Sequence, residues 1–396
     1  MHPLLASTPH TSGHGHLLRH ASSPFTLIPS LSMPPRGTSN TIIRGDNLQV
    51  LTALNDQFQG LVRCIYIDPP YNNQEEYVHY TDTLDHETWL ADISLRIAAL
   101  KPLLASNGSL WISIDDRELH YLKVAADQIL GRERFVTTIV WEHRTSRENR
   151  NTFSNNHEYI LVYASDPSAF KAFRSGLPPT SAILARYKNP DSDPRGPWQS
   201  VTASVQAGHA TQSQFYVLTS PSGRRHSPPN GRCWVYTKKR MQAEIANNNV
   251  WFGKNGDAVP RLKKFLGHDR AEVTPATLWT AAEVGTTQHA KKQVLALFPG
   301  GPVFDTPKPE QLINRVLQIA TRPGDLVLDA YLGSGTTCAV AHKTGRRYIG
   351  IERGSRAAAL CSRRLKRVVS GEQGGISTEV KWCGGGGFDF FKVTEP

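Results

Sequence analysis

The 396-residue sequence predicts an α/β protein with a doubly wound sheet and one large insertion. Over residues 41–163 and 308–352, short apolar runs alternate with segments in which apolar residues recur every three to four positions. Several of these runs end directly in an acidic residue, at the place where open α/β sheets bind ligands. Between the two parts, over residues 186–292, helical periodicity fades and Pro, Gly, Asn and aromatic residues dominate. This change marks the insertion.

The first part of the sheet is predicted from its apolar runs. The run at 61–67 is apolar at nearly every position, which is typical of a strand buried on both faces. Trp89, Ile93 and Ile97 share one helical face, and Asn107-Gly108 follows as a stop signal. The predicted strands are 41–43, 61–67, 109–114, 136–141 and 159–163, and the predicted helices are 48–54, 86–104 and 117–130.

The tetrapeptide Asp68-Pro69-Pro70-Tyr71 directly follows the strand predicted at 61–67. It suits the binding of a planar ring that carries an amino group. The Asp68 carboxylate can accept hydrogen bonds from the amine, and the prolines fix the backbone so that the Pro69 carbonyl can do the same. Tyr71 offers a flat face for stacking. An ordinary strand-to-loop turn is the alternative, because Asp and Pro are common in turns.

A second motif follows the insertion. It consists of a helix at 308–320, a strand at 326–329, a Gly-x-Gly turn, a helix at 338–342 and a strand at 347–352. Gly333 and Gly335 permit close approach of a ligand to the backbone, and Glu352 can accept both hydroxyls of a ribose. The acid at position 329 would repel a pyrophosphate, whereas it suits a cationic nucleoside such as S-adenosylmethionine. No Gly-Lys-Ser/Thr phosphate loop is present, and the third glycine of the dinucleotide fingerprint is missing.

The insertion carries most of the positive charge. Residues 186–292 contain 16 Lys and Arg against seven Asp and Glu, a net +9 of the chain's +11. A localised basic region favours a nucleic-acid partner, with a solvated charged surface as the alternative. The interleaved aromatic residues are expected mostly in the core of this domain. Candidate phosphate contacts are Lys238, Lys239, Arg240, Arg261, Lys263 and Lys264.

The remaining composition narrows the class of protein. The five cysteines are scattered without a Cys-x-x-Cys pair, which argues against a disulfide framework or a zinc site and fits a reducing compartment. No run of 18 apolar residues is present, so no membrane span is expected. Residues 1–38 are rich in Ser, Pro and His and contain no acidic residue, which predicts a disordered tail.

Together the two motifs resemble those of DNA amino-methyltransferases of the β arrangement, in which the catalytic motif precedes the cofactor motif. Residues 68–72 match the catalytic motif and residues 329–335 the cofactor loop, with Tyr331 where the family usually has Phe. Residues 306–309 resemble the segment that lines the methionine end of the cofactor, and residues 45–47 the loop that reaches its adenine. The stretches 112–116, 155–159, 193–198 and 384–388 resemble modification subunits of type III restriction systems.

The resemblance implies a Rossmann-like, S-adenosylmethionine-dependent methyltransferase fold with a circularly permuted motif order and an inserted target recognition domain. The implied domains are a tail at 1–38, a catalytic half at 39–185, a DNA-binding insert at 186–292 and a cofactor-binding half at 293–396. The implied catalytic residues are Asp68, Pro69, Pro70 and Tyr71. The implied cofactor-binding residues are Asp46, Thr306, Lys308, Asp329, Tyr331, Gly333, Gly335, Thr336 and Glu352, and no metal ligand is implied.

The resemblance also implies the reaction. A methyl group would pass from S-adenosyl-L-methionine to the N6 amino group of adenine in double-stranded DNA. The aspartate in the first motif position favours adenine; N4-cytosine is the alternative, followed by an amine on RNA or on a protein glutamine. A catalytically inactive DNA-binding module is an alternative of another class. A cytoplasmic, nucleoid-associated location is expected, and a homodimer and a cognate restriction subunit are left open.

Overall fold

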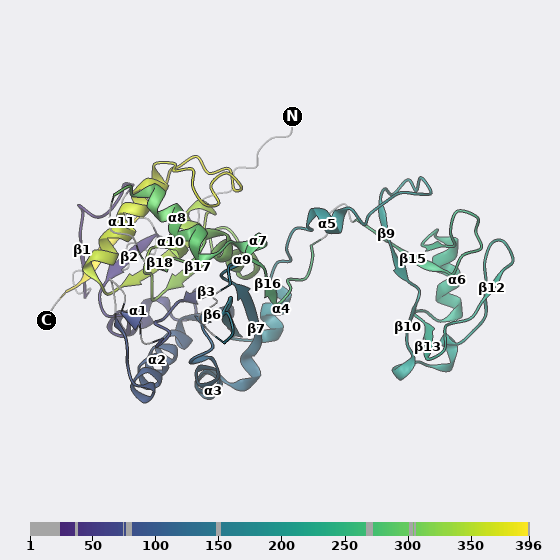
Figure 1. Ribbon diagram of the computed structural model, residues 1–396, viewed down its shortest axis with the longest axis horizontal. Helices are drawn as coiled ribbons and strands as arrows, with labels where there is room; N and C mark the ends of the chain where they lie inside the picture. The colour runs from purple at the N-terminus through teal and green to yellow at the C-terminus, as the bar shows by residue number, and fades with distance from the viewer. Residues whose placement is uncertain are drawn as a thin grey trace. The chain divides into compact units, whose positions relative to one another are not determined.

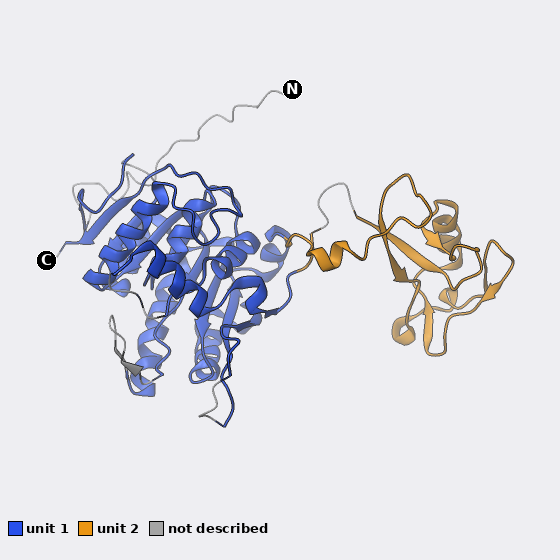
Figure 2. Cartoon of the chain, turned by 45° about the horizontal axis from the view of Figure 1, so that its top comes forward, with its two compact units in different colours: residues 1–175, 275–396 blue, residues 176–274 orange. Residues whose placement is uncertain are grey.

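The computed structural model describes residues 24–35, 39–73, 75, 76, 81–147, 152–266, 272–300, 304 and 306–394. The chain divides into two compact units, which Figure 2 shows in different colours. Unit 1 comprises residues 1–175 and 275–396, and unit 2 comprises residues 176–274. Unit 2 therefore begins and ends earlier in the sequence than the insertion predicted at 186–292. Residues 275–292 belong to unit 1, where a strand at Leu278–Trp279 pairs with the main sheet.

Within the described residues, unit 1 is organised around a ten-stranded sheet of order β1-β19-β2-β18-β17-β3-β6-β8-β7-β16. The central strands from β19 to β6 run parallel, β8 is antiparallel to both of its neighbours, and β1 is antiparallel to β19. The strands are β1 (Phe25–Leu27), β2 (Thr41–Arg44), β3 (Val62–Ile67), β6 (Leu104–Ile114), β7 (Phe135–Glu142), β8 (His157–Ala164), β16 (Leu278–Trp279), β17 (Leu326–Asp329), β18 (Arg347–Glu352) and β19 (Asp389–Val393). A separate hairpin pairs β4 (Glu75–Glu76) with β5 (Thr81–Asp82).

Helices cover both faces of this sheet, with α1 to α3 on one side and α9 to α11 on the other (Figure 1). No helix in the described residues is long and apolar enough to cross a bilayer. The helices of unit 1 are α1 (Asn47–Phe58), α2 (His86–Leu100), α3 (Leu119–Leu130), α4 (Pro167–Phe173), α7 (Ala281–Val284), α8 (Thr287–Leu297), α9 (Glu310–Ala320), α10 (Thr336–Lys343) and α11 (Ser355–Val369), with short 3-10 turns η2 (Lys101–Leu103) and η3 (Arg132–Arg134).

The α/β sheet predicted from the sequence is confirmed. Each predicted strand and helix has a counterpart in the structure, and the helix predicted to 104 ends at Leu100, where η2 leads into β6. The apolar side chains of β3 and β17 are fully or almost fully buried, as expected for central parallel strands. The elements of unit 1 that were not predicted are α4, α7, α8, α11, β1, β4, β5, β16 and β19.

The tail predicted over residues 1–38 is wrong for part of its length. Phe25 is buried, and β1 pairs with β19 at the edge of the sheet. Met33 forms a further bridge with Phe388, and the Ser32 hydroxyl accepts a hydrogen bond from the Phe390 amide at 2.9 Å. These contacts join segments more than 350 residues apart, so local composition could not reveal them. Residues 1–23 and 36–38 lie outside the described residues.

Unit 2 contains short antiparallel sheets around its own core. Trp234, Met241 and Phe252 form the centre of that core, and the prediction that most aromatic residues here are core residues is confirmed. The elements are α5 (Ser181–Leu184), β9 (Trp198–Thr202), β10 (Ser204–Gln206), η4 (Ala207–His209), η5 (Gln212–Gln214), β11 (Leu218–Thr219), β12 (Arg225–His226), β13 (Arg232–Trp234), α6 (Lys238–Ala246), β14 (Val250–Trp251) and β15 (Arg261–Phe265).

One predicted phosphate contact in unit 2 is wrong. The ammonium of Lys263 is buried, pairing with Asp191 and lying 2.9 Å from the Asp193 carboxylate. Because β15 alternates its side chains between two faces, Lys263 points inward while the adjacent Lys264 is exposed. Arg261, the first residue of the strand, is also exposed. Lys238, Lys239 and Arg240 are exposed as predicted.

Candidate active site

A cavity of about 1630 Å³ lies in unit 1 at the carboxyl ends of the parallel strands. It exists there because β3 and β17 are adjacent and parallel, with Ile65 opposite Leu328, so that the residues following both strands meet at one edge. β18 lies on the other side of β17, with Gly350 opposite Asp329. The predicted residues that line the cavity are Asp46, Asp68, Pro69, Pro70, Tyr71, Thr306, Lys308, Asp329, Tyr331, Gly333, Thr336 and Glu352.

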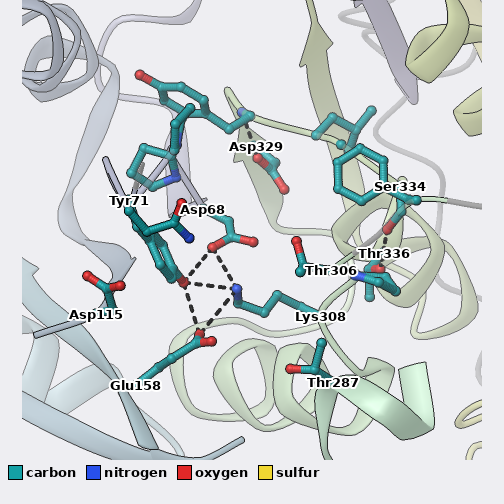
Figure 3. Close-up of a pocket in the computed structure, with 18 of the residues that line it drawn as sticks. Asp68, Tyr71, Asp115, Glu158, Thr287, Thr306, Lys308, Asp329, Ser334 and Thr336 are labelled. Carbon is teal, nitrogen blue, oxygen red and sulfur yellow. Dashed lines mark hydrogen bonds and ion pairs between the residues drawn. The ribbon is translucent and has the colours of Figure 1, made fainter. Parts of the chain in front are cut away.

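Four polar side chains form a compact cluster on one wall, and Figure 3 shows their contacts as dashed lines. The Tyr71 hydroxyl lies 2.8 Å from Asp68 Oδ1 and 3.0 Å from Glu158 Oε2, and it can donate to either. Lys308 Nζ lies 2.8 Å from Asp68 Oδ1 and 3.3 Å from Glu158 Oε2. It also donates a hydrogen bond of 2.9 Å to the Tyr71 hydroxyl. We call these four residues the carboxylate cluster.

Enclosure changes the proton affinities in the carboxylate cluster. Burial raises the pKa of Asp68 above its usual value, and the Lys308 ammonium opposes that rise. Burial alone would lower the pKa of Lys308, but the Asp68 and Glu158 carboxylates outweigh it and raise that pKa. Burial also raises the pKa of the Tyr71 phenol. The lysine is therefore a cation and the tyrosine a neutral donor at neutral pH.

The backbone that carries Asp68 and Tyr71 is held by side chains from the neighbouring helices. The Trp89 indole donates a hydrogen bond of 2.8 Å to the Pro70 carbonyl. Asn72 adopts a left-handed conformation, with φ of 57°, which Asn tolerates better than most residues. Its amide donates to Glu118 Oε1 at 2.9 Å, and Arg117 donates to its carbonyl at 3.1 Å. The loop geometry after the predicted catalytic motif is thus fixed by α2, α3 and the turn before α3.

The opposite wall is formed by the predicted cofactor loop. Gly333 has φ of 53°, and a Cβ there would lie 3.1 Å from the Phe304 ring. Its amide donates to Glu352 Oε2 at 2.8 Å, and the Gly354 amide donates to Glu352 Oε1 at 2.8 Å. The carboxylate at the end of β18 therefore anchors the loop after β17. Burial raises the pKa of Glu352.

Gly335 and Thr336, both predicted to bind the cofactor, also have structural contacts that hold the loop. Gly335 lies outside the described lining of the cavity and caps α10 with φ of 82°. Thr336 lines the cavity, but its hydroxyl accepts a hydrogen bond of 2.9 Å from buried Arg364. Arg364 also pairs with Glu310 at 2.9 Å, so Thr336 is tied to the core between α9 and α11. Gly335 and Thr336 thus help to fix the conformation of the loop where it joins α10.

The predicted adenine-side residue Asp46 belongs to a further network. Its carboxylate caps α1 through the amides of Leu48 and Gln49, and it lies 3.4 Å from an Arg96 nitrogen. Arg96 donates to Asn47 Oδ1 at 2.6 Å, and Asn47 donates to the Ala330 carbonyl at 3.0 Å. The network joins α1 and α2 to the start of the cofactor loop.

Several lining residues were missing from the predicted site. Glu158 and Asp115 come from the ends of β8 and β6, and Asn47 and Arg96 come from the first two helices. Glu158 lay within a stretch noted for its resemblance, but no spacing rule assigned it to the cavity. Burial raises the pKa of Asp115 to about 6. Lys308 was assigned to the cofactor, yet its ammonium lies in the carboxylate cluster.

Comparison with known families agrees with this geometry. Residues 62–362 match the N6_N4_Mtase family, described as DNA methylase. The chain belongs to this family. The match spans both motifs of this chain together with unit 2.

Two curated relatives are modification subunits. The type III restriction-modification enzyme StyLTI Mod subunit of Salmonella typhimurium is 32% identical over 76% of this chain and 49% of its own length. The probable type III enzyme HindVI Mod subunit of Haemophilus influenzae is 30% identical over 89% and 54%. The chain thus spans about half the length of these relatives. A solved cytosine-N4-specific PvuII DNA methyltransferase aligns at 13% identity and TM-score 0.47, covering 91% of this chain and 97% of its own.

We expect Asp329 to make the stability of this chain pH-dependent. Burial raises its pKa to about 7, against 3.8 in an unfolded chain. Between these values the folded state binds more protons than the unfolded state, so the free energy of unfolding falls as pH rises. We expect Asp329→Asn to be more stable than the parent at pH 8, by up to about 4 kcal/mol at 1.36 kcal/mol per pKa unit.

Urea unfolding at pH 4 and pH 8 checks this expectation. The difference between Asp329→Asn and the parent should be small at pH 4 and largest at pH 8. Asp56→Asn, which alters an exposed carboxylate of α1, serves as the control and should give no such difference. A parent more stable than Asp329→Asn at pH 8 would contradict the assignment.

Proposed function

We propose that this chain is an S-adenosyl-L-methionine-dependent DNA methyltransferase that modifies the N6 amino group of adenine. One observation carries the proposal: Asp68 directly follows β3 and Asp329 ends the adjacent parallel strand β17, so that a pocket for an amine and a loop for a nucleoside open into one cavity. A group can pass between two ligands only if both are held at contact distance. The names of the modification-subunit relatives and the aspartate at position 68 favour adenine.

The residues of the cofactor wall fit S-adenosyl-L-methionine. Asp329 and Glu352 face the cavity and would favour a cationic ligand over a phosphate. Glu352 retains acceptor capacity for the ribose hydroxyls, since each of its oxygens receives one amide hydrogen bond. Phe304 and Tyr331 add aromatic surface. When bound, this cofactor supplies an electrophilic methyl group.

The carboxylate cluster would hold the target base. An amino group paired within a duplex is not accessible, so the base must leave the helix at a cost of a few kcal/mol. Asp68 accepts hydrogen bonds from the amine and turns the nitrogen lone pair toward the donor. Tyr71 stacks on the ring of the base. Because Asp68 and Glu158 fix the Tyr71 hydroxyl, the tyrosine ring is already oriented before the base enters. Catalysis of this kind depends on positioning and electrostatics.

Unit 2 would read the DNA target. Its exposed basic residues, among them Lys238, Lys239, Arg240, Arg261 and Lys264, are available for phosphate contacts. With a DNA substrate we propose a cytoplasmic, nucleoid-associated location. A second copy of the chain and a cognate restriction subunit are further partners that the resemblance to modification subunits suggests, and both are tested by co-purification.

Genome-wide mapping of modified bases tests the proposed function. The chain is expressed in a host that lacks its own DNA methylation, and modified positions are read by single-molecule sequencing. We expect N6-methyladenine at one short sequence motif. Modified cytosine would select the N4-cytosine reaction, and an unmodified genome in cells that contain folded protein would favour an inactive DNA-binding module.

A further inference from the structure

Lys308 is shared between two carboxylates. Its Nζ contacts both Asp68 and Glu158 (Figure 3), at 2.8 Å and 3.3 Å. The Lys308 side chain is 8% exposed. Glu158 is the second residue of β8, and Asp68 directly follows β3. In the sheet, β6 lies between these two strands. The lysine thus joins carboxylates that reach the cavity from opposite sides of one strand.

The charge of the carboxylate cluster follows from this sharing. Two carboxylates and one ammonium leave a net charge of about −1 when all three are ionised. Without the Glu158 carboxylate, Asp68 and Lys308 would neutralise each other. An amine that accepts a methyl group becomes positively charged, so a neutral cluster would stabilise that charge less than a negative one.

We propose that Glu158 is a positioning residue that shares the charge of Lys308 and so keeps the carboxylate cluster negative overall toward the target amine. The inference rests on the proposed function and adds a residue to it. Glu158 acts through Lys308 and the Tyr71 hydroxyl, and it has no need to contact the base itself. The same contacts fix the Tyr71 ring.

Other titratable groups that face Glu158 provide a local probe of its charge. His143 Nδ1 lies 3.5 Å from Glu158 Oε1. The negative charge of Glu158 also contributes to the raised pKa of Asp115. Burial lowers the pKa of His143, and the Glu158 carboxylate opposes that effect. The pKa of His143 in the ligand-free protein therefore depends on the charge of Glu158.

A charge-removing and a charge-keeping variant together test the proposal. Glu158→Gln makes the cluster neutral, and we expect kcat to fall about 100-fold with KM for DNA and cofactor affinity nearly unchanged. Glu158→Asp keeps the net charge of about −1, and we expect it to retain at least about ten-fold more activity than Glu158→Gln. Tyr71→Phe removes the hydroxyl and leaves the charges, and it should cost less than Glu158→Gln.

Glu133→Gln, an exposed glutamate of η3 outside the cavity lining, is the matched control and should retain parental activity. NMR titration of His143 in the ligand-free protein gives a second readout, in which Glu158→Gln should lower the histidine pKa. An active Glu158→Gln, a Glu158→Asp variant no better than Glu158→Gln, or an unchanged His143 titration would each overturn the proposal. An inactive parent protein would instead count against the proposed function.

Discussion

Asp68→Ala is expected to reduce methyl transfer by about 1,000-fold or more while cofactor binding persists. The change removes the carboxylate that accepts hydrogen bonds from the target amine. It leaves Lys308 paired with Glu158 at 3.3 Å, so no buried cation loses all of its partners. The fold should therefore survive, and the loss of activity can be assigned to chemistry.

Single-turnover methylation of unmodified DNA measures this effect, and calorimetry with S-adenosyl-L-methionine measures the retained affinity. Asp56→Asn, on the exposed face of α1, is the control and should behave as the parent. A purified Asp68→Ala protein that methylates DNA at the parental rate would show that Asp68 is not the amine acceptor.

Glu352→Ala is expected to weaken cofactor affinity about 100-fold, because it removes two functions at once. The ribose loses its acceptor, and the amides of Gly333 and Gly354 lose a carboxylate that holds each at 2.8 Å. Hydrogen bonds to a charged group contribute about 1.5–3 kcal/mol each, so even one lost interaction matches a ten-fold effect or more.

Calorimetric titration with S-adenosyl-L-methionine tests the role of Glu352, with Glu133→Gln as the control. At saturating cofactor, Glu352→Ala should regain part of its methylation rate, whereas Asp68→Ala should not. Unchanged affinity in Glu352→Ala would mean that this carboxylate only supports the loop.

The sequence predicted those parts of the site that lie at the ends of contiguous apolar strands. Asp68, Asp329 and Glu352 directly follow or end such strands, and parallel pairing brings strand ends together whatever the intervening chain does. The catalytic and cofactor motifs could therefore be placed at one edge of the sheet before any coordinates were known.

The remainder depended on contacts that no local pattern encodes. Glu158 reaches Tyr71 because β8 is antiparallel to β6, and Lys308 donates to a hydroxyl 237 residues away. Lys263 was expected on a surface, but an alternating strand and two aspartates place it inside unit 2. Similarly, β1 was missed because its partner β19 is formed by the other end of the chain.

We propose that one cavity of this chain transfers a methyl group to the amine of a DNA base. The most direct measurement incubates the purified chain with unmethylated DNA and isotopically labelled S-adenosyl-L-methionine, digests the DNA to nucleosides and identifies the labelled one by mass spectrometry. We expect labelled N6-methyldeoxyadenosine, which should be absent when Asp68→Ala replaces the parent. A folded parent protein that binds the cofactor and labels no nucleoside would contradict the claim.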